Sequence, residues 1–404
     1  MKLDAATLRF VEEHGHDDVR RLALQASRFP EVDMPMALVQ IAGRQAAAIK
    51  VPSLAAVHGV LYPPHLSMEQ CSSEPTARYK ASLVEGHRLA DLTGGFGIDS
   101  AFLARRFAHA VYVERQPLLC ELARHNFPLW GLPQVEVHTA EASDYLEQME
   151  PVDWIFLDPA RRDHAGGKTV AIADCEPDVR LLEERLLQKS PRVLLKLSPM
   201  LDVWQACAEL HRVAQVHIVA VGGECKELLL VLERDACLQP ADVPVHAVTL
   251  QPDGTACPLV FTRRSEQESP CTYATLPATY LYEPHAALLK GGAFRTLSYI
   301  YKVDKLHPNS HLYTSHQWIP TFPGRSFRVE SYAGFGKREL KSLLTDLRQA
   351  NLTVRNFPAS VADLRKRLHL GEGGDTYLFA TTLAGGEKVL IRCRKPEVSV
   401  SSLV

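Results

Sequence analysis

The paired-cysteine motifs of zinc ribbons and thiol–disulfide enzymes are absent from this 404-residue sequence. Its nine cysteines stand singly, with no C-x-x-C spacing, so neither kind of site is predicted. No run of 18 or more apolar residues occurs, which argues against a membrane span. The amino terminus lacks the long apolar segment of a secretory signal. We therefore expect a cytoplasmic protein with reduced cysteines and no metal.

A strong charge of either sign is also missing. The net charge is −2 at pH 7, which gives no nucleic-acid signature for the whole chain. From Ser331 to the end, however, twelve Lys and Arg stand against seven Asp and Glu, an excess of five. On composition alone, a solvated surface explains this excess better than a bound partner does.

The length of the chain and its pattern of apolar and polar residues predict four regions, because 404 residues are too many for a single compact core. Residues 1–80 show apolar residues at helical spacing and predict an N-terminal helical domain. Residues 81–240 alternate short apolar runs with helical stretches, which is typical of a parallel sheet buried on both faces. Seven such runs, the last two joined by a short connection, predict an α/β Rossmann-like sheet of seven strands whose final strand is reversed.

The remaining residues predict C-terminal α+β modules. In residues 241–328, two strand-like runs flank Asp253-Gly254, which indicates a hairpin. Residues 329–404 alternate strand and helix patterns and predict a small separate domain.

A glycine-rich turn between a strand and a helix is the most informative segment. It reads Asp91-Leu-Thr93-Gly94-Gly95-Phe-Gly97-Ile-Asp99, and so lacks the G-x-G-x-x-G spacing of dinucleotide-binding turns. Glycines here let backbone N–H groups approach a cofactor closely. A plain turn is the alternative interpretation, which the ordered succession of strand, turn, helix, strand and acid disfavours.

Two acids follow at the ends of the next strands. Glu114 lies 23 residues beyond Asp91, where a carboxylate can accept both hydroxyls of a ribose. Glu141 follows the third strand and is placed to reach an adenine amino group, although an exposed acid at a helix start would look the same.

The charge of Asp91 discriminates between two cofactors. A carboxylate beside the turn would repel the pyrophosphate of a nicotinamide dinucleotide, whereas it suits the ammonium and sulfonium of S-adenosylmethionine. The pattern therefore favours S-adenosylmethionine over a nicotinamide oxidoreductase.

A second turn follows the fourth strand and reads Asp158-Pro159-Ala-Arg161-Arg162. An acid at this place lies in the ligand crevice of an open α/β sheet. Asp158 or the Pro159 carbonyl can accept an N–H from an acceptor amine. The arginines either contact phosphate or a base, or pair with an acid of a neighbouring helix. Lys196, in the fifth strand, either faces the same site or pairs with a carboxylate.

These motifs resemble the first motif, the following acid and the fourth motif of class I methyltransferases. The whole chain resembles a bacterial methyltransferase family with a THUMP-like C-terminal domain, and the further matches include 72–80, 282–287 and 371–380. The resemblance implies a ferredoxin-like segment near 275–328 and a THUMP-like module that holds RNA. It also singles out Tyr79, Lys80 and Tyr282 as pocket residues, for which a structural role is the alternative.

The sequence thus predicts methyl transfer to a nucleic-acid acceptor, a base nitrogen of rRNA or tRNA. Asp158, Pro159 and Arg161 are the predicted catalytic residues. The predicted cofactor contacts are Asp91, Thr93, Gly94, Gly95, Gly97, Asp99, Glu114 and Glu141, and the predicted substrate contacts are Arg162, Lys196, Tyr79, Lys80 and Tyr282. The alternatives are a non-catalytic RNA-binding protein and a methyltransferase acting on a protein or small molecule. C5-pyrimidine methylation is disfavoured, because it needs a cysteine nucleophile and neither Cys175 nor Cys225 has a supporting motif.

Overall fold

A computed structural model describes residues 3–161 and 171–396. They divide into two compact units. The first takes in the chain up to Gly222 together with Lys226–Val243 and Leu250–Ala256. The second takes in Gly223–Cys225, Pro244–Thr249 and the chain from Cys257 onwards. The four-part division drawn from the sequence stays a prediction.

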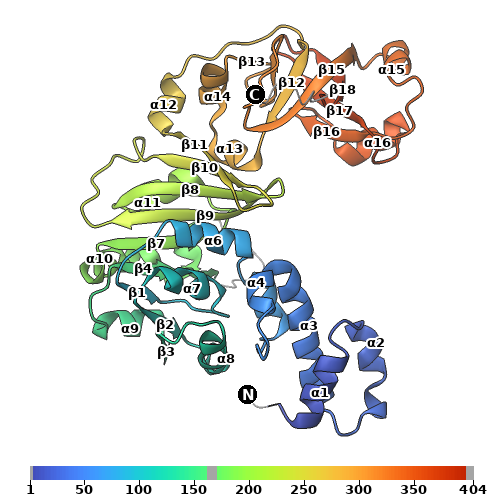
Figure 1. Cartoon of the computed structure of the whole chain (residues 1–404). Helices are drawn as coiled ribbons and strands as arrows, with labels where there is room; N and C mark the ends of the chain where they lie inside the picture. The colour runs from blue at the N-terminus through green and yellow to red at the C-terminus, as the bar shows by residue number, and fades with distance from the viewer. Residues whose placement is uncertain (1–2, 162–170, 397–404) are drawn as a thin grey trace, which may run out of the picture. The chain divides into compact units, whose positions relative to one another are not determined.

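Helices open the first unit (Figure 1). Asp4, Asp18 and Asp33 cap three of them, since each carboxylate accepts a backbone N–H from the first turn. Phe10 and Ile41 lie in the apolar cluster that holds these helices together. The helices are α1 (Ala5–Glu13), α2 (Val19–Leu24), α3 (Met34–Lys50), α4 (Pro52–Ala55), α5 (His65–Gln70) and α6 (Glu74–Ser82), with a 3₁₀ turn at Ala26–Arg28.

Seven neighbouring strands of a nine-stranded sheet form the body of this unit, in the order β8-β9-β7-β4-β1-β2-β3 (Figure 1). The five strands from β7 to β3 are parallel, and β9 runs antiparallel to β7. The strands are β1 (Arg88–Asp91), β2 (His109–Glu114), β3 (Val135–Thr139), β4 (Trp154–Leu157), β7 (Arg192–Leu197), β8 (Val213–Val221) and β9 (Glu224–Glu233). The predicted Rossmann-like sheet with a reversed last strand is confirmed.

The sheet is apolar because helices of the βαβ crossovers cover it. All four residues of β4 are buried. The covering elements are α7 (Ile98–Leu103), α8 (Pro117–Leu129), α9 (Ala142–Gln148), α10 (Val179–Lys189) and α11 (Val203–Glu209), with 3₁₀ turns at Ala104–Arg106 and Ile172–Asp174. A small ladder, β5 (Ala160–Arg161) with β6 (Cys175–Glu176), follows β4.

The second unit is the predicted α+β part. The hairpin expected at Asp253-Gly254 is present as β10 (Val245–Leu250) and β11 (Ala256–Phe261), which are neighbours in a sheet. A separate sheet has the order β13-β14-β12-β15-β18-β17-β16, and in this described part of the chain only the β16–β17 pairing is parallel. Leucines of α15 and α16 pack on the face that carries Leu378 and Leu390.

The elements of this unit follow α12 (Arg263–Glu268) in chain order. They are β12 (Tyr280–Pro284), α13 (Ala286–Gly291), α14 (Phe294–Tyr301), β13 (Asp304–Lys305), β14 (Tyr313–Ser315), β15 (Gly324–Gly334), α15 (Lys337–Leu343), β16 (Asn351–Arg355), α16 (Val361–Leu368), β17 (Thr376–Thr382) and β18 (Lys388–Arg394). Across the described residues of both units, no helix is long and apolar enough to cross a bilayer.

Candidate functional site

A cavity of about 990 Å³ opens at the edge of the sheet where the parallel strands end. Its walls come from the segments after β1, β2, β3, β4 and β7, and from the chain around α5. This carboxyl edge is where open α/β sheets bind ligands. The lining segments are 66–67, 70–72, 92–99, 114–116, 140–143, 158–160, 175–178, 181–182 and 196–199, with Leu119, Phe156 and Lys226.

The glycine turn forms one wall, and each glycine meets a separate steric demand. A Cβ on Gly94 would lie 2.1 Å from Cε2 of Tyr112. Gly95 and Gly97 have φ values of +54° and +85°, a backbone conformation that side chains disfavour. Next to Gly95 the nearest atom to a built Cβ is 4.0 Å away, so its backbone is open to an approaching ligand.

Thr93 stands in place of the first glycine of the usual motif, and its hydroxyl explains why. The backbone N–H of Asp158 donates to Thr93 Oγ1 at 2.6 Å. The glycine turn after β1 is therefore bonded directly to the acidic turn after β4.

Asp91 lies behind the glycine turn and does not line the cavity. It is 1% exposed, and it accepts the backbone N–H of Thr93 at 3.0 Å and the hydroxyl of Ser100. The structure thus places this carboxylate against the turn and the start of α7. Burial raises the pKa of Asp91 to about 7, although the bonds from Ser100 and Thr93 oppose the shift.

We expect Asp91→Asn to stabilise the protein increasingly as pH rises. Between the ordinary pKa of an aspartate, about 4, and the folded value of about 7, the folded chain keeps a proton that the unfolded chain has lost. Folding stability from this group is therefore lost as pH rises through that window, on the order of 4 kcal/mol in all. The midpoint of thermal unfolding of the variant minus that of the wild type should increase by several degrees between pH 5 and pH 8.

Asp144→Asn is the matched control, because Asp144 is exposed on α9. A difference in midpoint between Asp91→Asn and wild type that stays constant over pH 5–8 would show that Asp91 does not titrate in this way.

The acids predicted to hold the nucleoside line the cavity. Glu114 is buried at the end of β2 and accepts the backbone N–H groups of Gly95 at 3.0 Å and Gln116 at 2.9 Å. These bonds fix the carboxylate against the glycine turn. Glu141 is exposed at the N-terminal cap of α9 and makes no side-chain capping bond there.

The acidic turn after β4 faces the same cavity through Asp158 and Pro159. The Asp158 side chain is 37% exposed, and its Oδ2 lies 2.6 Å from Nζ of Lys196. The backbone of Arg161 pairs with Cys175 in the β5–β6 ladder. Arg162 lies outside the described residues.

Behind Asp158, acids and lysines alternate. Asp99, in the first turn of α7, lies 3.3 Å from Lys196 Nζ and 3.2 Å from Lys80 Nζ. Lys80 also lies 2.6 Å from Glu227 of β9. Burial opposes the ammonium of Lys196, but Asp158 and Asp99 raise its pKa well above the ordinary value.

Three of the predicted substrate residues do not line the cavity. Lys80 is fully buried, with its ammonium enclosed by the partners above and by Ser72. The Tyr79 hydroxyl lies 2.8 Å from Nδ1 of His217. Tyr282 is in the second unit, buried, where its hydroxyl donates to Gln317 O and accepts from Ile319 N. Each of these three side chains is thus held by contacts within its own unit, and their role toward a substrate stays a prediction.

Two features of the site were not predicted from the sequence, namely a buried support of the glycine turn and one wall of the cavity. Tyr112, buried under the glycine turn, donates its hydroxyl to the carbonyl of Gly95. The chain around α5, including Leu66 and Cys71, forms one wall of the cavity, and none of the motifs at the strand ends predicts it. Cys175 also lines the cavity, whereas Cys225 does not.

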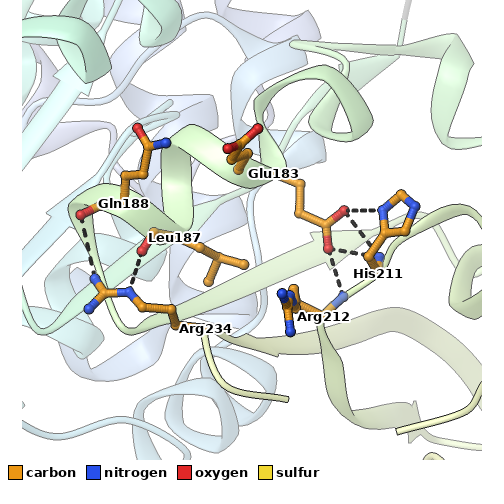
Figure 2. A pocket seen from close by; sticks show the side chains of 7 residues that line it. Glu183, Leu187, Gln188, His211, Arg212 and Arg234 are labelled. Carbon is orange, nitrogen blue, oxygen red and sulfur yellow. Dashed lines mark hydrogen bonds and ion pairs between the residues drawn. The ribbon is translucent and has the colours of Figure 1, made fainter. Parts of the chain in front are cut away.

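A second hollow, of about 340 Å³, lies at the opposite edge of the sheet (Figure 2). It adjoins α10 where β8 begins and β9 ends, and β9 ends beside the start of β7. Glu183 accepts the backbone N–H groups of His211 and Arg212 there, each at 2.8 Å, and Arg234 donates to Leu187 O near the end of α10 (Figure 2). These contacts cap backbone groups, which is a structural task.

The donor set of the large cavity suits a nucleoside cofactor rather than a metal. Among the described residues, no group of three or more His, Cys, Asp or Glu side chains could hold a metal ion. A glycine turn without Cβ atoms, an acid fixed at the end of β2 and a second acid after β3 match the ribose and base of S-adenosylmethionine.

Comparison with known proteins supports this assignment. Residues 280–323 match the model of a ferredoxin-like domain, and residues 324–395 match that of a THUMP-like domain. A Mycobacterium tuberculosis S-adenosylmethionine-dependent methyltransferase, itself uncharacterized, is 23% identical over 79% of this chain and 84% of its own.

A solved structure agrees over the whole length. A Porphyromonas gingivalis W83 protein with a provisional methyltransferase name is 37% identical, covers 98% of this chain and 100% of its own, and superposes with a TM-score of 0.87. The chain therefore belongs to this family of S-adenosylmethionine-dependent methyltransferases, with S-adenosylmethionine as its cofactor.

Proposed function

We propose that this chain transfers the methyl group of S-adenosylmethionine to a base nitrogen of RNA in the 990 Å³ cavity. The observation that carries the proposal is the bond from Asp158 N to Thr93 Oγ1, because it joins the cofactor turn to the acidic turn. The cavity lies at the upper end of the usual range for small-molecule sites, about 300–1,000 Å³. It therefore has room for an acceptor beside the cofactor.

The residues divide the work by position. The turn 93–97 and Glu114 hold the cofactor, and Asp91 fixes the turn from behind. S-adenosylmethionine supplies an electrophilic methyl group on a sulfonium. Asp158 accepts an N–H of the acceptor amine and so orients the nitrogen lone pair, and the Pro159 carbonyl can serve as a second acceptor. Much of the rate gain then comes from proximity and alignment.

Features of the second unit support RNA as the acceptor. Its THUMP-like segment carries the local excess of positive charge. In the β12–β15 ladder, Arg328 lies opposite Tyr280, whose ring is 5.3 Å from that of Trp318, a side chain that is 36% exposed. Arg394 lies opposite Arg328 on the next strand. Aromatic rings beside arginines are the surface on which unpaired bases stack.

A labelling experiment tests the acceptor class. The protein and methyl-labelled S-adenosylmethionine are incubated with RNA, DNA and protein pools from cells that lack the gene for this chain. We expect label in the RNA pool, sensitive to ribonuclease. Label confined to the protein or DNA pool, or in no pool, would contradict RNA methylation.

A further inference from the structure

Five charged side chains form a row that runs from the cavity into the interior. In order they are Asp158, Lys196, Asp99, Lys80 and Glu227, and the charges alternate in sign. Exposure of the side chains falls from 37% at Asp158 to 13%, 10%, 0% and 3% along the row. Only the first three line the cavity. Any effect of Lys80 and Glu227 on the cavity therefore has to pass through their neighbours in the row.

Asp99 is the centre of the row. Lys80 approaches its Oδ1, whereas Lys196 at 3.3 Å and the hydroxyl of Ser72 at 2.8 Å approach its Oδ2. These three partners come from α6, the segment before it and β7, and Lys80 in turn pairs with Glu227 of β9. Burial opposes ionisation of Asp99, but Lys80 and Lys196 hold its pKa below the ordinary value.

An ammonium as deeply buried as Lys80 is costly unless it is paired. Packing alone does not require a cation at this position of α6, because an apolar side chain of the same length would fill the space. The contacts give the cation a different task, namely to keep the cavity-lining Asp99 ionised and fixed. A carboxylate there favours a cofactor that carries ammonium and sulfonium charges.

We propose that Lys80, backed by Glu227, is a positioning residue for cofactor binding that acts through Asp99. This inference rests on the proposed function only in its cofactor, and not on the identity of the methyl acceptor. It extends the cofactor site into α6 and β9, two elements outside the motifs of the sheet edge.

Calorimetric titration of the full-length chain with S-adenosylmethionine from pH 5.5 to pH 8 tests the proposal. We expect Lys80→Met to weaken binding at least tenfold at pH 6, with a smaller loss at pH 8. The sign follows because loss of a cation raises the pKa of Asp99, so Asp99 is neutral at the acid end and regains its charge as pH rises. Lys80→Arg keeps the cation and should restore the wild-type profile.

Other charged groups lie near Asp99, and Lys80 lowers the pKa of one of them, Glu227, so Lys80→Met is also compared with a double variant that lacks the Glu227 carboxyl. These groups are Asp91, Asp158, Lys196, Cys71 and Glu227. Arg78→Met is the matched control, since Arg78 lies on the same helix, is 56% exposed and pairs with Glu74. It should bind as the wild type does at every pH.

Lys80→Met leaves two buried carboxylates without their shared cation and can fail to fold. Lys80→Met with Glu227→Gln removes one charge of each sign and should show the same acid-side loss. Wild-type affinity at all pH values in a folded variant overturns the proposal, as does an equal loss at all pH values, which marks a purely structural role. If the wild type itself did not bind S-adenosylmethionine, the proposed function would fail first, and that outcome is distinct.

Discussion

Asp158→Asn is expected to lower the rate of methyl transfer to RNA by a factor of at least about 100. The Asp158 carboxylate is the half-exposed acceptor at the cavity, and Lys196 holds it from one side at 2.6 Å. An amide of the same shape presents an oxygen and an NH₂ group instead of two acceptor oxygens. The variant therefore loses orientation of the acceptor nitrogen while the cofactor turn stays intact.

Transfer from labelled S-adenosylmethionine and cofactor affinity by calorimetry should be measured on the same preparations. The cofactor dissociation constant should change less than about threefold, because Asp158 contributes its backbone N–H to Thr93 in the variant as well. Asp178→Asn provides the control, since Asp178 also lines the cavity and asparagine caps α10 equally well. Full activity in Asp158→Asn would remove Asp158 from the mechanism.

Gly94→Ala is expected to weaken S-adenosylmethionine binding by roughly two orders of magnitude. Its methyl group would lie 2.1 Å from the ring of Tyr112, which is itself fully buried and bonded to the Gly95 carbonyl. Neither the ring nor the turn can move without shifting the other. We also expect a loss of about 1–3 kcal/mol in unfolding free energy from overpacking.

A double substitution separates this steric cause from others. With Tyr112→Val in place, Gly94→Ala should cost much less affinity, because the clashing ring atoms are gone. Gly371→Ala is the control, since Gly371, like Gly94, does not have positive φ, and its built Cβ would make only ordinary contacts, the nearest with the Arg348 carbonyl oxygen at 3.5 Å. An equal loss for Gly94→Ala with and without Tyr112 would refute the clash as the cause.

The sequence alone was enough to predict the parallel sheet and the edge of the sheet at which the cavity lies. Most of the apolar runs of residues 81–240 form largely buried strands, such as β4 and β7, although β3 is only partly buried. Apolar runs that are separated by helices have few alternative structures. The glycines and Glu114 could be predicted from the sequence for two reasons. A backbone that approaches a cofactor closely needs glycines, and the acid at the end of the next strand follows them at a fixed spacing along the chain. Both signals are local along the chain.

Contacts between segments that are far apart in the sequence could not be predicted from such local patterns. Asp91 was expected to act on the cofactor by its charge, whereas its carboxylate bonds to Ser100 and to the turn itself. The spacing between Asp91 and the glycines is the same whether the carboxylate faces the cofactor or the turn. Only the fold shows which side of the turn the carboxylate occupies.

The alternating row of charges was equally hidden, although part of its signal was present. Lys196 interrupts an apolar run, and Glu227 is the first residue of another. A charged side chain in a buried strand requires a partner of opposite charge. The sequence around Lys80 does not indicate that this lysine is buried, because lysines in short helices are common on protein surfaces. Its burial depends on how α6 packs against α7 and the sheet, which no local pattern encodes.

Hydrogen–deuterium exchange with and without S-adenosylmethionine tests most directly whether the cofactor binds at the carboxyl edge of the sheet. We expect slower exchange in the presence of the cofactor at residues 93–97, 114–116 and 141–143. We expect no change at the second hollow, around His211 and Arg212 (Figure 2). Protection of the second hollow with none at residues 93–97 would show that the cofactor does not bind at this edge.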